Sequence, residues 1–208
     1  LAGLKGSGGE FLIRSLIGDV KLSAGEMTLF GQPYKPKSPV DAWKNGVAYL
    51  PGDRTGEGLI VDFAVQTNLT MASMPHRGPF LDYRQEHSIA RELIDQLQIK
   101  VPSSVVPTNS LSGGNMQKVV LGKCMAPQPN VLLLNNPTRG IDVGARMQVY
   151  AIIRKLADQG ISVILLSEDL LELIGMCDRM MILRKGEISR VLSHEDLPSE
   201  KEIISYMI

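Results

Sequence analysis

The pattern of apolar and polar positions predicts strands and helices in alternation, interrupted by a helical segment. Near the start, a short apolar run leads into a glycine-rich loop and then into a predicted helix over residues 9–17. Apolar runs bounded by glycine predict short strands over 25–31 and 46–50. Between 59 and 107 strand patterns are scarce, "PHRGP" predicts a hinge, and helical spacing predicts a helix over 83–100. We therefore expect a helical insertion between two α/β halves.

After this insertion, short apolar runs and helical patterns alternate again. Strands are predicted over 131–134, 161–166 and 180–183, with helices over Val143–Asp158 and Leu170–Met176 between them. The sequence "RKGEI" predicts a hairpin turn into a last strand over 189–192. Apolar strands separated by helices are typical of a mainly parallel sheet covered on both faces. The fold class predicted is therefore α/β.

Composition excludes several classes of protein. The 208 residues include 22 Lys+Arg and 22 Asp+Glu, so a net charge of zero provides no global field for nucleic acid. The longest apolar runs, such as 163–166, are far shorter than the roughly 18 residues needed to span a bilayer. Cys124 and Cys177 fit no metal or redox spacing, and we interpret them as buried thiols in a reducing compartment.

The stretch "GLKGSGGE" partly matches the phosphate-binding pattern G-x-x-x-x-G-K-[ST]. Glycines in such a loop let backbone N–H groups turn toward a phosphate, and the following helix start adds positive potential. Gly9 and Glu10 stand where the pattern has a lysine for the phosphates and a hydroxyl for Mg²⁺. A plain strand–turn–helix explains this stretch equally well, with Lys5 as a solvated loop lysine. The candidate phosphate-contacting residues are Gly3, Gly6, Ser7, Gly8, Gly9 and Glu10.

A second motif, "LSGGNMQK", places a hydroxyl and two glycines before a predicted amphipathic helix. This arrangement makes an anion site at a helix N-terminus, with Ser112 as a side-chain donor. A simple helix cap is the alternative, because Ser-Gly-Gly is common in loops. The candidate residues of this motif are Ser112, Gly113, Gly114 and Gln117.

The order of the motifs makes the pattern specific. A glycine loop, a helical insertion and "LSGGNMQK" are followed by the apolar run "VLLLNNP" and by "RGID", which ends at Asp142. In this order the chain resembles the ATP-binding cassette (ABC) family over essentially its whole length, with "LSGGNMQK" similar to the signature motif, "VLLLNNP" to Walker B and Asp142 to the D-loop. "GDRTGEGL" and "PTRGIDVGA" are most similar to the second cassette of bacterial monosaccharide importers. The resemblance implies a P-loop NTPase (ABC ATPase) fold.

The chain departs from this family at six positions that serve catalysis or metal binding. Gly9 and Glu10 stand at the positions of the Walker A lysine and hydroxyl, and Asn135 stands at that of the Walker B aspartate. Asn136, Glu168 and Gly52 stand at the positions of the catalytic glutamate, the switch histidine and the Q-loop residue. Asparagine forms hydrogen bonds but supplies no negative charge to hold Mg²⁺ or to draw a proton from water. Losing a general base costs about 10²- to 10⁴-fold in rate. The resemblance therefore implies that the chain's own site has no intact catalytic residue, holds no metal and does not hydrolyse ATP.

The intact signature implies a different role in the family. There the signature closes over the γ-phosphate held by the opposite cassette, so we expect ATP and Mg²⁺ mainly at that composite site and weak or no nucleotide at the chain's own site. The implied partners are a second cassette fused upstream, transmembrane permease subunits and, indirectly, a sugar-binding protein, without nucleic acid. The implied location is cytoplasmic, on the inner face of the cell membrane. A regulatory or scaffolding ABC protein without a transport role, and a decayed copy, are the alternatives.

The resemblance also predicts a division of the chain into three parts. Residues 1–58 would form the P-loop part, 59–118 the helical signature subdomain, and 119–208 the Walker B part, with 51–58 as a hinge. The chain opens on a strand that a domain must bury and has no initiator methionine. We therefore expect it to be part of a longer polypeptide, with earlier strands outside the sequence.

Overall fold

The computed structural model describes residues 1–193 and 199–208. The chain divides into two compact units by packing. Unit 1 comprises Leu1–Tyr49, Leu133–Asn136 and Val163–Ile208, and unit 2 comprises Leu50–Leu132 and Pro137–Ser162. The three-part division predicted above follows sequence pattern rather than packing, and it stays a prediction.

Unit 1 contains a three-stranded sheet in the order β1-β9-β10. The middle strand β9 (Arg179–Arg184) pairs in parallel with β1 (Ala2–Gly3) and antiparallel with β10 (Glu187–Ser193), as the predicted hairpin requires. Ile182 at its centre is fully buried and lies opposite Ala2. The same unit also contains α1 (Gly9–Ser15), β2 (Thr28–Leu29), β3 (Gln32–Pro33), α2 (Pro39–Lys44), α7 (Leu170–Met176) and α8 (Glu200–Met207).

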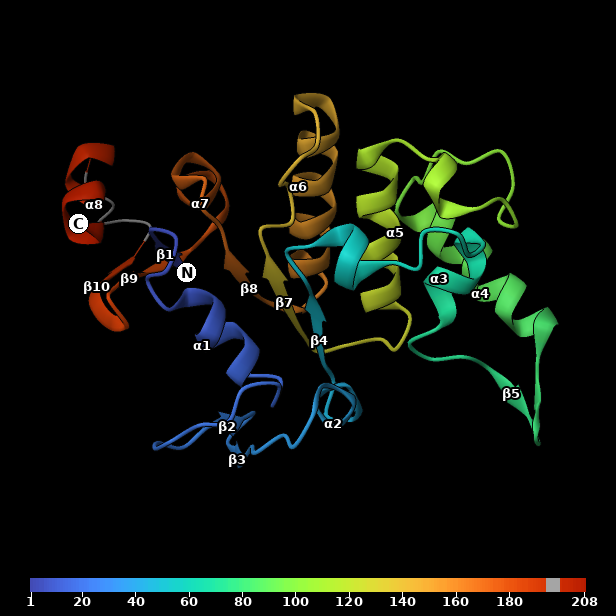
Figure 1. Ribbon diagram of the computed structural model, residues 1–208, viewed down its shortest axis with the longest axis horizontal. Coiled ribbons are helices and arrows are strands. Elements are labelled where there is room, and N and C mark those ends of the chain that lie inside the picture. Colours follow the sequence, from blue (N-terminus) through green and yellow to red (C-terminus); the bar gives the residue numbers. More distant parts are fainter. Residues whose placement is uncertain (194–198) are drawn as a thin grey trace. The chain divides into compact units, whose positions relative to one another are not determined.

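A second three-stranded sheet has the order β4-β7-β8, with β7 in the middle (Figure 1). Its strands are β4 (Val47–Leu50), β7 (Val131–Asn135) and β8 (Ser162–Leu166). Every residue of β7 is buried, which is why its sequence is almost wholly apolar. The helix α6 (Val143–Asp158) connects β7 to β8, and such a helical crossover is typical of parallel strands. The expected α/β class is therefore confirmed.

Unit 2 is mainly helical, as the predicted insertion requires. Helix α3 (Val65–Thr70) packs against α4 (Tyr83–Gln96) and α5 (Gly113–Met125), and α5 also packs against α6 (Figure 1). The unit also contains a π-helical turn η1 (Arg54–Gly58), strands β5 (His76–Arg77) and β6 (Phe80–Leu81), and a 3₁₀ turn η2 (Thr108–Ser110). Within the part of the chain that the structure describes, no helix is long and apolar enough to cross a membrane.

Three local predictions about element boundaries were wrong. The "PHRGP" segment forms β5 and the turn of the antiparallel hairpin β5–β6 rather than a hinge, with Arg77 opposite Phe80. The helix predicted over 83–100 ends at Gln96, because Gln98 adopts a positive φ of 51° that no helix continues. The strand predicted over 25–31 shrinks to Thr28–Leu29, next to the exposed Phe30.

The predicted amphipathic character of the helix after Ser112 was wrong, and the predicted burial of the two thiols is confirmed for one of them. Helix α5 is not amphipathic: it is buried along most of its length, including Lys118, because α3, α4 and α6 pack around it. Cys124 is buried, and burial raises the pKa of its thiol to about 12, so that it stays protonated and unreactive. Cys177, by contrast, is only partly buried.

Candidate nucleotide-binding surfaces

The glycine-rich loop of unit 1 connects β1 to α1. Gly6 and Gly8 adopt φ values of 83° and 103°, which side chains rarely tolerate, and Gly8 is the residue before the helix. The Ser7 carbonyl accepts a 2.8 Å hydrogen bond from the Gly186 N–H, which fixes the loop against the β9–β10 turn. The strand, loop and helix that the sequence predicts here are therefore present, and the glycines are required by the backbone.

Gly9 and Glu10, which the family resemblance places at the Walker A lysine and hydroxyl positions, take part in other contacts. A Cβ added at Gly9 would lie 2.7 Å from Leu166 Cδ1, so Leu166 takes the space that a side chain would need. Glu10 lies 3.8 Å from Arg14 across one helical turn, in an exposed ion pair that contributes little to stability. Neither position offers a cation or a hydroxyl group to a phosphate or to Mg²⁺.

Two asparagines at the end of β7, Asn135 within the strand and Asn136 directly after it, form a chain of hydrogen bonds within unit 1. Asn135 Nδ2 donates to Tyr49 Oη at 3.1 Å, and Asn136 Nδ2 donates to Asn135 Oδ1 at 3.0 Å. Asn136, at φ 47°, accepts through Oδ1 a 2.9 Å bond from the Glu168 N–H. The amide dipoles therefore satisfy one another without an ion.

This chain of amides does not fit a magnesium site. Mg²⁺ in phosphate-binding sites is held by carboxylates and hydroxyl groups, and the described residues contain no cluster of three or more His, Cys, Asp or Glu side chains able to hold a metal. Tyr49 was not predicted, because the bond to Asn135 joins residues far apart in the sequence. Gly52, the remaining altered position, belongs to unit 2.

The signature residues lie at the start of α5 in unit 2. Ser112 is the N-cap, and its Oγ accepts hydrogen bonds from the Asn115 backbone N at 3.5 Å and from Asn115 Nδ2 at 3.0 Å. Because both lone pairs of this oxygen are used, its own proton is free to donate away from the helix. The backbone N–H groups of the first turn have no intrahelical acceptor either. The start of α5 therefore presents several donors on one side.

The two signature glycines differ in the space around them. A Cβ added at Gly113 would meet nothing closer than Arg54 Nη2, at 3.5 Å. A Cβ added at Gly114 would collide with the Cβ of Ala145, which means that α5 and α6 approach closely there. Gln117 is buried and accepts a 3.4 Å bond from Arg54 Nη1. Gln117 thus supports the turn η1 rather than facing outward.

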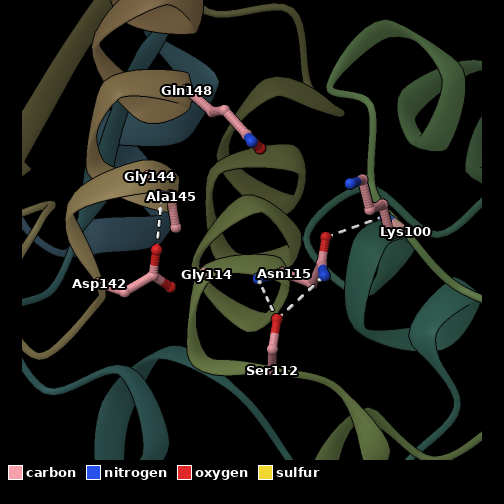
Figure 2. Close-up of a pocket in the computed structure, with 8 residues that line it drawn as sticks. All are labelled: Lys100, Ser112, Gly114, Asn115, Asp142, Gly144, Ala145 and Gln148. Carbon is pink, nitrogen blue, oxygen red and sulfur yellow. Dashed lines mark hydrogen bonds between the residues drawn. The ribbon is translucent and has the colours of Figure 1, made fainter.

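A pocket of about 230 Å³ lies between the first turns of α5 and α6 (Figure 2). Asp142 caps α6 by accepting a 2.9 Å bond from the Ala145 N–H. Ser112 and Asn115 lie at the α5 side, and Lys100 and Gln148 complete the wall. The structure thus brings Ser112 and Gly114 to one pocket with Asp142, whereas Gly113 and Gln117 are not part of its lining. The pocket also includes Lys100, which sequence reasoning missed.

The close approach at Gly114 carries a stability prediction. We expect Gly114→Ala to lower the free energy of unfolding by about 1–2 kcal/mol, because overpacking outweighs the gain of up to about 1 kcal/mol in helix propensity. Gly113→Ala is the matched control and is expected to be neutral or slightly stabilising, because its site is open. Chemical denaturation of both variants measures the difference. Equal stabilities would show that α5 and α6 are not in close contact there.

Comparisons with known proteins identify the family and the fold of this chain. Residues 1–139 match the family model described as ABC transporter. The cassette MJ1267, an ATP-binding cassette of an ABC transporter solved in its ADP conformation, has a TM-score of 0.81 at 17% identity over 99% of this chain and 85% of its own. The dimeric cassette MJ0796, in a post-hydrolysis state bound to ADP and Pi, has a TM-score of 0.77 at 18% identity, over 93% and 83%. The fold is thus that of an ATP-binding cassette, and the chain belongs to the ABC transporter family.

Among curated proteins, the chain is similar to three import proteins with different sugars in their names. It is 41% identical to the ribose import ATP-binding protein RbsA 3 of Rubrobacter xylanophilus, over 98% of this chain and 41% of the relative. It is 41% identical to the xylose import ATP-binding protein XylG of Moorella thermoacetica, over 97% of this chain and 40% of the relative. It is 38% identical to the arabinose import ATP-binding protein AraG of Pectobacterium atrosepticum, over 100% of this chain and 42% of the relative. The chain spans about two-fifths of the length of these relatives.

Proposed function

We propose that this chain is a nucleotide-binding cassette of an ABC-type carbohydrate importer, in which it couples ATP use to sugar uptake without hydrolysing ATP at its own site. Its signature would complete the ATP site of a partner cassette. The observation that carries the proposal is the contrast between the two surfaces: Asn135 and Asn136 satisfy each other without charge, whereas Ser112 and the first turn of α5 keep their donors available.

The relatives support the carbohydrate part of this proposal, since their names specify import of ribose, xylose and arabinose. A dimeric arrangement is supported by the similarity to a cassette solved as a dimer with ADP and Pi. In such a dimer this chain would work at the cytoplasmic face of the membrane, with permease subunits as partners and a sugar-binding protein acting through them. Its length relative to the relatives is consistent with fusion to the partner cassette.

The roles of individual residues follow from their hydrogen bonds. The Ser112 hydroxyl and the free N–H groups at Gly113 and Gly114 are suited to a γ-phosphate presented by the partner, because helix N-termini bind anions. Mg²⁺ and the attacking water would belong to the partner's carboxylates, since Asn135 and Asn136 supply none. Donors fixed before the reaction stabilise charge that develops on the phosphate.

A trapping experiment tests this division of roles. In the two-cassette assembly, meaning this chain together with its partner cassette, vanadate and Mg-ATP are expected to trap a single ADP. The physical reason is that trapping needs Mg²⁺ and a competent catalytic site, which only the partner's Walker residues provide. The ADP retained per assembly after gel filtration measures this. Two trapped nucleotides would contradict the proposal, because the chain's own site would then have to bind Mg²⁺.

A further inference from the structure

Lys100 lies next to the signature, although the two are apart in the sequence. Its backbone N–H donates a 2.9 Å bond to Asn115 Oδ1, and the same carboxamide donates through Nδ2 to Ser112 Oγ at 3.0 Å. One side chain therefore fixes the positions of both residues. The Lys100 side chain is exposed and lines the pocket between α5 and α6 (Figure 2). Its backbone is thus held by Asn115, while its exposed ammonium group can reach a ligand.

A second lysine adds positive charge behind the pocket wall. Lys118 is only 2% exposed, and its Nζ donates to the Gln98 carbonyl at 2.9 Å and to Gln148 Oε1 at 2.7 Å, which are both neutral groups. Burial lowers the pKa of Lys118, and the neighbouring charge of Lys100 lowers it further. Lys100 lines the pocket and Lys118 bonds to the lining residue Gln148, so both lysines place positive charge at this pocket.

The pocket offers little negative charge to offset these cations. Asp142 is the one carboxylate in its lining, and its Oδ1 is engaged by the Ala145 N–H as a helix cap. Among the described residues, neither lysine has a carboxylate within ion-pair distance. The N-termini of α5 and α6 add partial positive charge. These positive charges would attract an anion into the pocket.

We propose that Lys100 is a phosphate-binding residue of the signature surface, and that its ammonium group binds the polyphosphate of the nucleotide held by the partner cassette. This inference rests on the function proposed above. Lysine binds phosphate as a flexible point charge and needs no fixed geometry. The hydroxyl of Ser112 and the charge of Lys100 would then act on the same ligand, because Asn115 holds both residues.

A kinetic experiment separates the ammonium group from the backbone. Lys100→Met keeps the N–H bond to Asn115 and removes only the charge. In the two-cassette assembly, we expect it to raise the KM for Mg-ATP about tenfold, with a much smaller change in kcat, because the lost interaction is a charge-assisted hydrogen bond. Lys100→Arg should restore a KM close to that of the parent. Lys155→Met, at an exposed position of α6 outside the pocket, is the matched control and should leave KM unchanged.

A labelling experiment provides a readout that does not depend on turnover. Acetic anhydride should modify Lys100 less in the vanadate-trapped assembly than in the nucleotide-free assembly, while Lys155 is modified equally in both. Gly113→Asp, measured alongside, tests the function itself. Suppose that Gly113→Asp abolishes ATPase activity, but Lys100→Met leaves KM unchanged and Lys100 is not protected from acetylation. The role of Lys100 is then overturned, and the proposed function stands. If Gly113→Asp has no effect, the proposed function fails and the inference fails with it.

Discussion

Gly113→Asp is expected to lower the ATPase rate of the two-cassette assembly by about 100-fold or more, a loss as large as that caused by removing a fixed donor to a developing charge. The substitution places a carboxylate in the first turn of α5, beside the Ser112 hydroxyl. A carboxylate there repels the partner-held phosphates and occupies the space in which their oxygens would meet the helix N-terminus. The steady-state ATPase rate at saturating Mg-ATP measures the loss.

The structure indicates that this loss would not come from misfolding. A Cβ added at Gly113 has no neighbour closer than 3.5 Å, and an acidic residue in the first turn of a helix is electrostatically favourable. Arg54, whose Nη2 is that nearest neighbour, would help to hold the new carboxylate at the surface. Gly113→Ala is the control and should retain most of the activity. An unchanged rate in a folded Gly113→Asp assembly would mean that the signature takes no part in hydrolysis.

The purified chain alone is expected to hydrolyse no ATP above background, and Asn136→Glu alone is expected to leave it inactive. The loss of a general base accounts for about 10²- to 10⁴-fold in rate, but restoring a carboxylate at position 136 does not restore the rest of the site. Gly9 would still provide no lysine, and Asn135 would still provide no charge for Mg²⁺. Effects within one catalytic unit are not additive, so one repair recovers little.

The hydrogen bonds around Asn136 further limit the activity that Asn136→Glu could restore. Its Nδ2 donates to Asn135 Oδ1, and a glutamate cannot make that bond. A lysine at position 9 would first require Leu166 to move. A coupled-enzyme ATPase assay on the purified chain and on Asn136→Glu tests both statements. Clear turnover by the purified chain, or a large gain from Asn136→Glu, would show that the glycine loop binds Mg-ATP.

The sequence alone predicted those helices and loops whose positions depend on neighbouring residues in the chain. The helices Val143–Asp158 and Leu170–Met176 have the predicted bounds, because cap residues and apolar spacing lie next to each other in the chain. The positions of the glycine loop and of the helix after Ser112 were equally evident. The "PHRGP" hairpin was missed because its strands are too short to show an alternating pattern.

The interactions that decide chemistry at the two surfaces could not be predicted in this way. Leu166 fills the space beside Gly9, Tyr49 accepts from Asn135, and Lys100 reaches the signature through Asn115. Each of these contacts joins residues that are remote in sequence, and no local pattern marks them. The burial of α5 was misjudged for the same reason, since α3, α4 and α6 cover faces that the helix sequence alone leaves undefined.

A comparison of the two signatures within one assembly tests whether this chain completes its partner's ATP site. The measurement is the ATPase rate of the two-cassette assembly carrying Gly113→Asp in this chain, against the rate with the equivalent substitution in the partner's signature. We expect a loss of about 100-fold or more for this chain's substitution. We expect a change of no more than about twofold for the partner's substitution, because that signature faces a site without a general base or a metal. Equal losses from the two substitutions, or a larger loss from the partner's, would contradict the proposed function.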